Sequence, residues 1–200
     1  MTFDTFDEGI ALGGIRNKDE IKTLICYLIH CVKESMSKNT VVESIVNDNI
    51  ANFFETCAAF DDLIKNGNLI ESGVLDGEQT YNLSERGIVI ANQLETSLSY
   101  TVREKTYKCA IKLLAEKKKR RENKTKIYKT DNGYVFNCRM LGGDIDLFEF
   151  SLYAPDLEQA NRMEKAFFDN PSAVYKTMLG LLTQDKETVG EALEDLYGVL

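Results

Sequence analysis

The sequence predicts an α+β fold in two parts, a helical part that ends in a β-hairpin and a second part built on a three-stranded antiparallel sheet. Apolar residues recur at helical spacing in the first half, whereas strand-like alternation appears in the second. Two turn signals, Asp76-Gly77 and Asn132-Gly133, each separate short apolar stretches, as in a β-hairpin. The expected organisation is an arm over 1–16, a helix-and-hairpin domain over 17–98, a connecting helix over 99–123, an α+β domain over 124–183 and an acidic tail with an amphipathic pattern over 184–200.

The amino-acid composition limits the kinds of protein that this chain can be. The chain has 200 residues, of which 44% are apolar and 28% charged, so it is long enough to bury a core without disulfides or a structural metal. Its net charge of -8 has the wrong sign for a protein that coats nucleic acid, although the local distribution of charge matters more than the total. The five cysteines are irregularly spaced, the first residues are acidic and no apolar run could cross a bilayer. We therefore expect a cytoplasmic protein without a membrane segment.

Three short helices are predicted in the first domain. Each begins with a polar cap followed three residues later by glutamate, at Asn17 with Glu20, Thr40 with Glu43 and Asn52 with Glu55. The first helix carries one apolar stripe, made of Ile21, Leu24, Ile25, Leu28, Ile29 and Val32. The third should end before Gly67, with Phe60 and Leu63 in the core.

A hairpin and a fourth helix follow. Leu69–Glu71 and Gln79–Leu83 flank the Asp76-Gly77 turn, and Ser84 opens the next helix. Three helices followed by a small hairpin is the element order of a winged helix-turn-helix. The segments Leu63–Ile70 and Tyr81–Gly87 resemble the wing strands of that superfamily and the helices that adjoin them. The N-terminal domain is therefore expected to be a winged helix-turn-helix.

The second half predicts a small sheet with helices on one face. A long helix over 95–123 carries Tyr100, Tyr107, Ile111 and Leu114 on one side. Strands are expected over 126–130, 134–140 and 145–153, the first two joined by a tight Asn132-Gly133 turn whose central residues need positive φ. Asp156 and then Asn170-Pro171 cap two further helices, and the tail has apolar residues at helical spacing, Val189, Leu193, Leu196 and Val199.

Short segments along most of the chain resemble a bacterial family, the domain of unknown function 4364. They are Gly13-Gly14-Ile15, Glu20–Leu28 without Thr23, Asn52-Phe53-Phe54 through Leu63, Asp131–Val135, and Asn170-Pro171 with Tyr175. The resemblance covers about residues 2–183 and leaves the tail out. It implies a winged-helix regulator by fold and supplies no catalytic residues.

No pattern in the sequence indicates an enzyme. The single histidine, His30, lies in a predicted helix and is best interpreted as a packed side chain. No Cys/His cluster has zinc spacing, and no phosphate loop or nucleophile motif occurs. Asp144 and Asp146 share a strand face but lack a third ligand, so a solvated edge is favoured over a metal site. We expect no catalytic residues, no metal and no cofactor.

The acidic residues of the predicted recognition helix argue against DNA binding by that helix. Its expected exposed residues are Asn52, Glu55, Ala58, Asp61, Asp62 and Lys65. The wing offers Asp76, Glu78 and Gln79, whereas positive charge gathers between Lys117 and Lys129. That run is either a solvated helix end, which suits the helix dipole, or a phosphate-contacting patch. The candidate DNA-binding residues are Asn52, Lys65, Gln79, Lys117, Lys118, Lys119, Arg120 and Arg121.

Two functions follow from these observations. The first is a winged-helix transcriptional regulator that binds double-stranded DNA as a homodimer, paired through the helix over 95–115 and the tail. The alternative is a winged-helix protein–protein interaction module that binds no DNA. The sheet half could hold a small effector, but no residue pattern names one.

Overall fold

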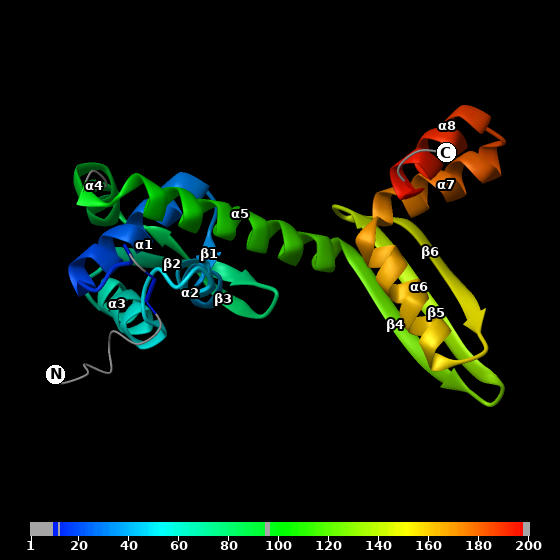
Figure 1. Ribbon diagram of the computed structural model, residues 1–200, viewed down its shortest axis with the longest axis horizontal. Helices are drawn as coiled ribbons and strands as arrows, with labels where there is room; N and C mark the ends of the chain where they lie inside the picture. Colours follow the sequence, from blue (N-terminus) through cyan, green and yellow to red (C-terminus); the bar gives the residue numbers. More distant parts are fainter. Residues whose placement is uncertain (1–9, 12, 95–96, 198–200) are drawn as a thin grey trace. The chain divides into compact units, whose positions relative to one another are not determined.

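A computed structural model describes residues 10–11, 13–94 and 97–197 and divides the chain into two compact units, Met1–Glu116 and Lys117–Leu200. The described residues form eight helices and two three-stranded antiparallel sheets, one sheet in each unit (Figure 1). The fold is therefore α+β, as the sequence predicted. The boundary between the units lies inside a helix, α5 (Tyr100–Glu122).

The first helix, α1 (Lys18–Val32), forms the centre of the N-terminal unit. The Asn17 side chain caps it by accepting a hydrogen bond from the Asp19 backbone N–H at 2.9 Å, as predicted from the sequence. Its apolar stripe is buried except for Val32, which is partly buried. Residues 1–9 and 12 of the expected arm lie outside the described residues. The remainder of the arm packs on the turn after α2, where the Ile15 N–H donates to the Ile50 carbonyl at 2.7 Å.

The second helix differs from the prediction. It begins at Lys38, not at Thr40, and runs to Val46 (α2, Lys38–Val46). Its cap is Ser37, whose side chain accepts from the Thr40 backbone N–H. Ser37 is extended because Met36–Ser37 form a short strand, β1, paired with Tyr81 and Thr80. Sequence periodicity cannot detect a two-residue strand, so this partner of the hairpin was missed.

The third helix and the hairpin match the prediction closely. In α3 (Phe53–Lys65) Asn52 is the cap, and Phe60 and Leu63 are buried together with Thr56 and Ala59. β2 (Leu69–Leu75) pairs with β3 (Glu78–Leu83), and the sheet order is β1-β3-β2. Asp76 and Gly77 both have positive φ, 54° and 78°, which the tight hairpin turn requires. The core between the helices and this sheet includes Phe60, whose ring meets Tyr81 edge-on at 5.3 Å.

Two further helices complete the N-terminal unit. α4 (Glu85–Leu94) follows Ser84, whose hydroxyl accepts from the Gly87 N–H, and it packs against α1. α5 packs through Val102, Thr106 and Ala110. Most of the stripe predicted on the long helix, namely Tyr100, Tyr107 and Ile111, is exposed, whereas Leu114 is partly buried against the core. The chain therefore leaves an apolar strip of α5 uncovered.

The C-terminal unit contains the second sheet, in the order β4-β5-β6. β4 (Asn123–Thr130) begins directly after α5, three residues earlier than predicted, and pairs with β5 (Gly133–Gly142), which pairs with β6 (Ile145–Ala154). The residues between β4 and β5 are Asp131 and Asn132, and neither has positive φ. The hairpin turn therefore forms where it was predicted, as a two-residue loop closed by the pair Thr130 and Gly133, but the positive φ expected at Asn132 is wrong.

Gly133 is required for a different reason. Its φ is 148°, and a Cβ atom there would lie 2.7 Å from the Ala154 carbonyl oxygen and 3.0 Å from Cε2 of Tyr153. The glycine lets the neighbouring strand and a tyrosine ring approach the backbone closely.

Three helices complete the C-terminal unit (Figure 1). α6 (Leu157–Asp169), capped by Asp156, covers one face of the sheet, where Phe167 packs on Phe136 and Phe148. α7 (Pro171–Thr183), capped by Asn170, pairs with α8 (Lys186–Tyr197). The caps at Asp156 and Asn170 and the helical tail follow the sequence prediction. Val199 lies outside the described residues, and Val189, Leu193 and Leu196 are partly buried.

Candidate nucleic-acid interface

The exposed side of α3 differs from the one expected. Of its predicted reading positions, Lys65 alone is exposed, whereas Asn52, Glu55, Ala58, Asp61 and Asp62 are half-buried. The Asn52 side-chain oxygen accepts from the Phe54 and Glu55 backbone N–H groups, at 2.8 and 3.4 Å, and so serves as the helix cap.

Both aspartates of α3 are held by lysines from other helices. The Nζ atom of Lys38, at the start of α2, lies 2.7 Å from Oδ1 of Asp61. The Nζ atoms of Lys18 and Lys22, both in α1, lie 2.8 and 3.4 Å from Oδ2 of Asp62. The hydrogen bond from Lys18 holds the pKa of Asp62 below its usual value, so this carboxylate stays ionised and paired. Three lysines thus compensate Asp61 and Asp62, two of the three carboxylates on α3 that argue against phosphate in the sequence.

Two aromatic rings stand at the start of α3. Phe53 and Phe54 are 51% and 74% exposed, and their rings meet edge-on at 5.5 Å. This pair is the most exposed apolar feature of the helix. The apolar periodicity of this helix placed neither phenylalanine in the core. Two aromatic residues outside the core stripe were therefore the sequence signal for an exposed apolar surface here.

The β2–β3 hairpin, which the sequence predicts to be a wing, is more apolar than basic. Gln79 is partly buried, and its side-chain amide donates to the Thr80 carbonyl at 3.3 Å. Glu78 accepts from Ser37 and Asn39, at 2.5 and 2.8 Å, which ties the hairpin to the start of α2. The exposed apolar side chains of β2 are Ile70, Val74 and Leu75.

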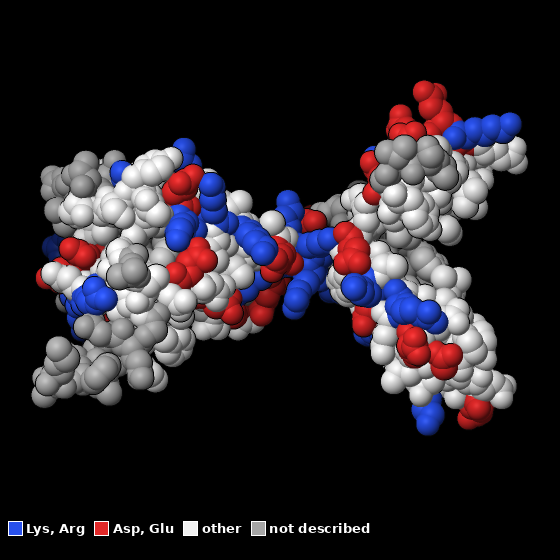
Figure 2. Space-filling model, viewed as in Figure 1, with Lys and Arg blue, Asp and Glu red and all other residues white. Residues whose placement is uncertain are grey.

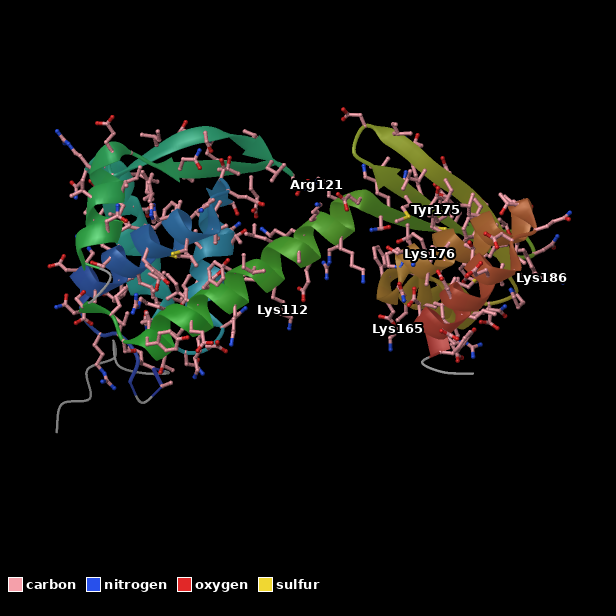
Figure 3. All side chains as sticks on the ribbon, turned by 90° about the horizontal axis from the view of Figure 1, so that it is seen from above. Lys112, Arg121, Lys165, Tyr175, Lys176 and Lys186 are labelled. Carbon is pink, nitrogen blue, oxygen red and sulfur yellow. The ribbon has the colours of Figure 1, made fainter. Side chains whose placement is uncertain are left out.

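The basic run lies in the C-terminal unit, at the end of α5 and along β4. Between 117 and 130 the sequence has eight Lys or Arg residues and one carboxylate, Glu122. The blue side chains gather in Figure 2 where α5 meets β4, and Figure 3 labels Arg121 at the helix end. Lys119 donates to the Asp169 carbonyl at 3.0 Å, Lys118 lies 3.9 Å from Glu122, and Arg120 is exposed.

The candidate residues therefore fall into two groups. Asn52, Lys65 and Gln79 belong to the N-terminal unit, whereas Lys117–Arg121 belong to the C-terminal unit. Within the first group Asn52 and Lys65 stand at opposite ends of α3. Lys18, Lys22 and Lys38 offset the negative charge of Asp61 and Asp62. The sequence analysis missed them because only the packing of α1 and α2 against α3 brings them next to these aspartates.

Other chemistry has little support among the described residues. All five cysteines lie in the described part of the chain and are free, and burial raises the pKa of Cys26 and of Cys138 to about 12. The prediction that Asp144 and Asp146 share a strand face is wrong, because Asp144 lies in the turn before β6, and Asp146 is paired with Arg139 at 2.5 Å. In residues 10–11, 13–94 and 97–197, no group of three His, Cys, Asp or Glu is placed to hold a metal ion. No described helix is both long and apolar enough to span a membrane.

Comparison with known families identifies the chain. A model described as a domain of unknown function, DUF4364, matches residues 21–182. The chain belongs to the DUF4364 family. The matched range begins inside α1 and ends near the end of α7, so Gly13-Gly14-Ile15 and α8 of this DUF4364 protein lie outside it. Neither a curated protein nor a solved structure gives a significant match.

Proposed function

We propose that this DUF4364 protein is a non-enzymatic, winged-helix transcriptional regulator that binds double-stranded DNA as a homodimer. The observation that carries the proposal is the topology of the N-terminal unit. The order helix, short strand, two helices and hairpin, with β1 paired to β3, resembles that of a winged helix-turn-helix, in which α3 would be the recognition helix. The pairing of Asp61 and Asp62 with lysines supports it, because lysines then offset the charge of two of the three carboxylates of α3.

Affinity in this proposal comes mainly from lysine and arginine side chains. Lys65 at the end of α3 and the run Lys117–Arg121 are the groups best suited to contact phosphates. Such contacts release counterions, so the affinity for any duplex should fall steeply as the salt concentration rises. Recognition of particular bases would then come from α3.

The dimer would use the uncovered strip of α5. Tyr100, Tyr107 and Ile111 recur on one side of this helix and are exposed in the single chain. A two-fold axis through such a strip would bury it against the same strip of a second copy. α8 contributes less than the sequence suggested, because it packs on α7 of its own chain.

The experiment is duplex binding measured by fluorescence anisotropy across salt concentrations, with random DNA and with fragments of the source genome. The proposal requires binding at low salt that weakens steeply with salt, and a genomic fragment that binds more tightly than random DNA. The double variant Asp61→Asn, Asp62→Asn frees three lysines and should bind duplex DNA at least as tightly as wild type. Absence of binding by both proteins at low salt would overturn the proposal.

A second function is favoured by one specific observation, the exposed apolar side chains beside the recognition helix. Phe53 and Phe54 on α3 and Val74 on the wing would find few apolar partners on base edges other than the thymine methyl group. Exposed aromatic side chains are enriched in protein–protein interfaces. A winged-helix interaction module would use this surface for a protein partner, and Phe54→Ala would then abolish partner binding while duplex binding stayed absent.

A further inference from the structure

The sheet of the C-terminal unit has one covered face and one open face. The covered face, under α6, contains Ile127, Phe136 and Phe150. Because side chains alternate along a strand, their neighbours point to the opposite face, here called the outer face. It comprises Lys124, Lys126, Tyr128, Val135, Asn137, Arg139, Glu149, Ser151 and Tyr153.

Two tyrosines lie in one row across the outer face. The strand register places Tyr128 beside Val135, and Val135 beside Tyr153. Tyr128 is 49% exposed and Tyr153 is 56% exposed. Tyrosines with this much exposed ring, held on a sheet, offer π-faces to a planar ligand.

The ring of Tyr153 is fixed in place. Its hydroxyl donates to the Asn132 carbonyl at 2.6 Å, and its Cε2 would lie 3.0 Å from a Cβ at Gly133. The glycine therefore lets the ring lie close against the backbone of β5. A ring held by its hydroxyl group loses little conformational entropy when a ligand stacks on it.

Positive charge flanks this aromatic row on the β4 side. Lys124 and Lys126 precede Tyr128 at alternate positions on the same face, and both are exposed. Arg139 is neutralised by Asp146, and Glu149 stands in the row of Lys124 and Arg139. The exposed lysines of this face therefore lie along β4, and β4 follows without a linker on the basic run Lys117–Arg121 at the end of α5.

We propose that the outer face binds a single-stranded polynucleotide, with unpaired bases stacked on Tyr128 and Tyr153 and phosphates along β4 and the end of α5. Base–aromatic stacking beside a basic track is the general mode of binding for single strands. A duplex keeps its bases stacked on one another and could use only the lysines of this face. The charge excess disfavours a basic protein or an apolar partner. This site is separate from α3 and does not depend on the proposed duplex binding.

The test uses the full chain and a short fluorescein-labelled oligothymidylate, with anisotropy measured at several salt concentrations. Tyr128→Ala should weaken binding about tenfold, within the range for loss of one stacked base, whereas Tyr128→Phe should bind as wild type does. Lys126→Gln should lower the salt dependence by about one phosphate contact. Tyr128 is preferred to Tyr153 because removal of the Tyr153 ring would uncover Gly133.

Matched controls lie away from the outer face. Lys165 projects from α6, which covers the opposite side of the sheet, and is exposed (Figure 3). Tyr197 on α8 is an exposed tyrosine at another place in the same unit. Lys165→Gln and Tyr197→Ala should both bind the oligonucleotide as wild type does, and circular dichroism should show that every variant is folded.

Three results would overturn the proposal. The first is the absence of oligothymidylate binding at low salt. The second is equal affinity for wild type and Tyr128→Ala. The third is an equal loss of single-strand and duplex affinity in Tyr128→Ala, because a stacking platform affects the single strand alone. Absence of duplex binding by both wild type and the Asp61→Asn, Asp62→Asn variant, with oligothymidylate binding retained, would reject the regulator proposal and leave this one standing.

Discussion

At the scale of single residues, the structure shows that the role of a side chain depends on the neighbours that the fold gives it. Asp62 appears in the sequence as an acidic residue on a recognition helix, yet two lysines of α1 hold it. Gly133 appears as half of a tight turn, yet its role is to admit Tyr153 and the Ala154 carbonyl. In both cases the deciding neighbour is distant in sequence, so local pattern could not supply it.

The pairing of Asp62 makes stability depend on pH. Its pKa is lowered from 3.8 in the folded chain, chiefly by the hydrogen bond from Lys18, so the carboxylate binds protons less readily when folded than when unfolded. The stabilisation is therefore present above the unfolded pKa and is lost as the pH falls through the folded pKa. In denaturant melts Asp62→Asn should be less stable than wild type at pH about 6, with the difference shrinking towards pH about 2. A difference that stays constant with pH would contradict this.

Phe60 is the largest of the fully buried side chains. It lies in one cluster with Leu28 and meets Tyr81 edge-on, so its removal would leave a cavity between α1, α3 and β3. Phe60→Ala should lower the free energy of unfolding by about 3–5 kcal/mol. Phe54→Ala, at an exposed position of the same helix, is the control and should change it by less than about 0.5 kcal/mol. Similar losses in the two variants would refute the placement.

At the scale of elements, polar caps and hairpin signals were the most predictable features. Asn17, Asn52, Asp156 and Asn170 all cap the helices that the sequence assigned to them, because a cap is a local hydrogen bond. β1 was not predictable, since two residues carry no periodicity and their pairing partner lies in β3. The residue types of the candidate site could be predicted from the sequence. The pairing of Asp61 and Asp62 with three lysines could not, because it depends on packing between helices.

The end of α5 permits a test of what its basic residues do. Replacing Lys117, Lys118, Lys119, Arg120 and Arg121 by glutamine should weaken binding to all duplex sequences alike and reduce the salt dependence, because phosphate contacts read no bases. Anisotropy titrations of wild type and variant on specific and random duplexes would measure this. Unchanged binding would mean that the run is a solvated helix end that serves the helix dipole.

At the scale of the whole molecule, the exposed apolar surface of α5 predicts self-association. Light scattering at micromolar concentration should give the mass of a dimer. Ile111→Asp places a charge in the uncovered strip and should shift the mass towards the monomer, whereas Lys112→Asp, at the next position and outside the strip, should leave it unchanged. A monomer mass for wild type would exclude pairing through α5.

The irregular pairing of β2 has a consequence for aggregation. β2 is an edge strand with three exposed apolar side chains, and such an edge can template the growth of intermolecular β-structure. Its register shifts between Glu71 and Gly73, so Ser72 is an extra residue that bends the edge and interrupts its row of hydrogen-bonding groups. Deleting Ser72 would straighten this edge. We expect the deletion variant to form thioflavin-positive fibres or amorphous aggregates under conditions in which the wild-type chain remains in solution.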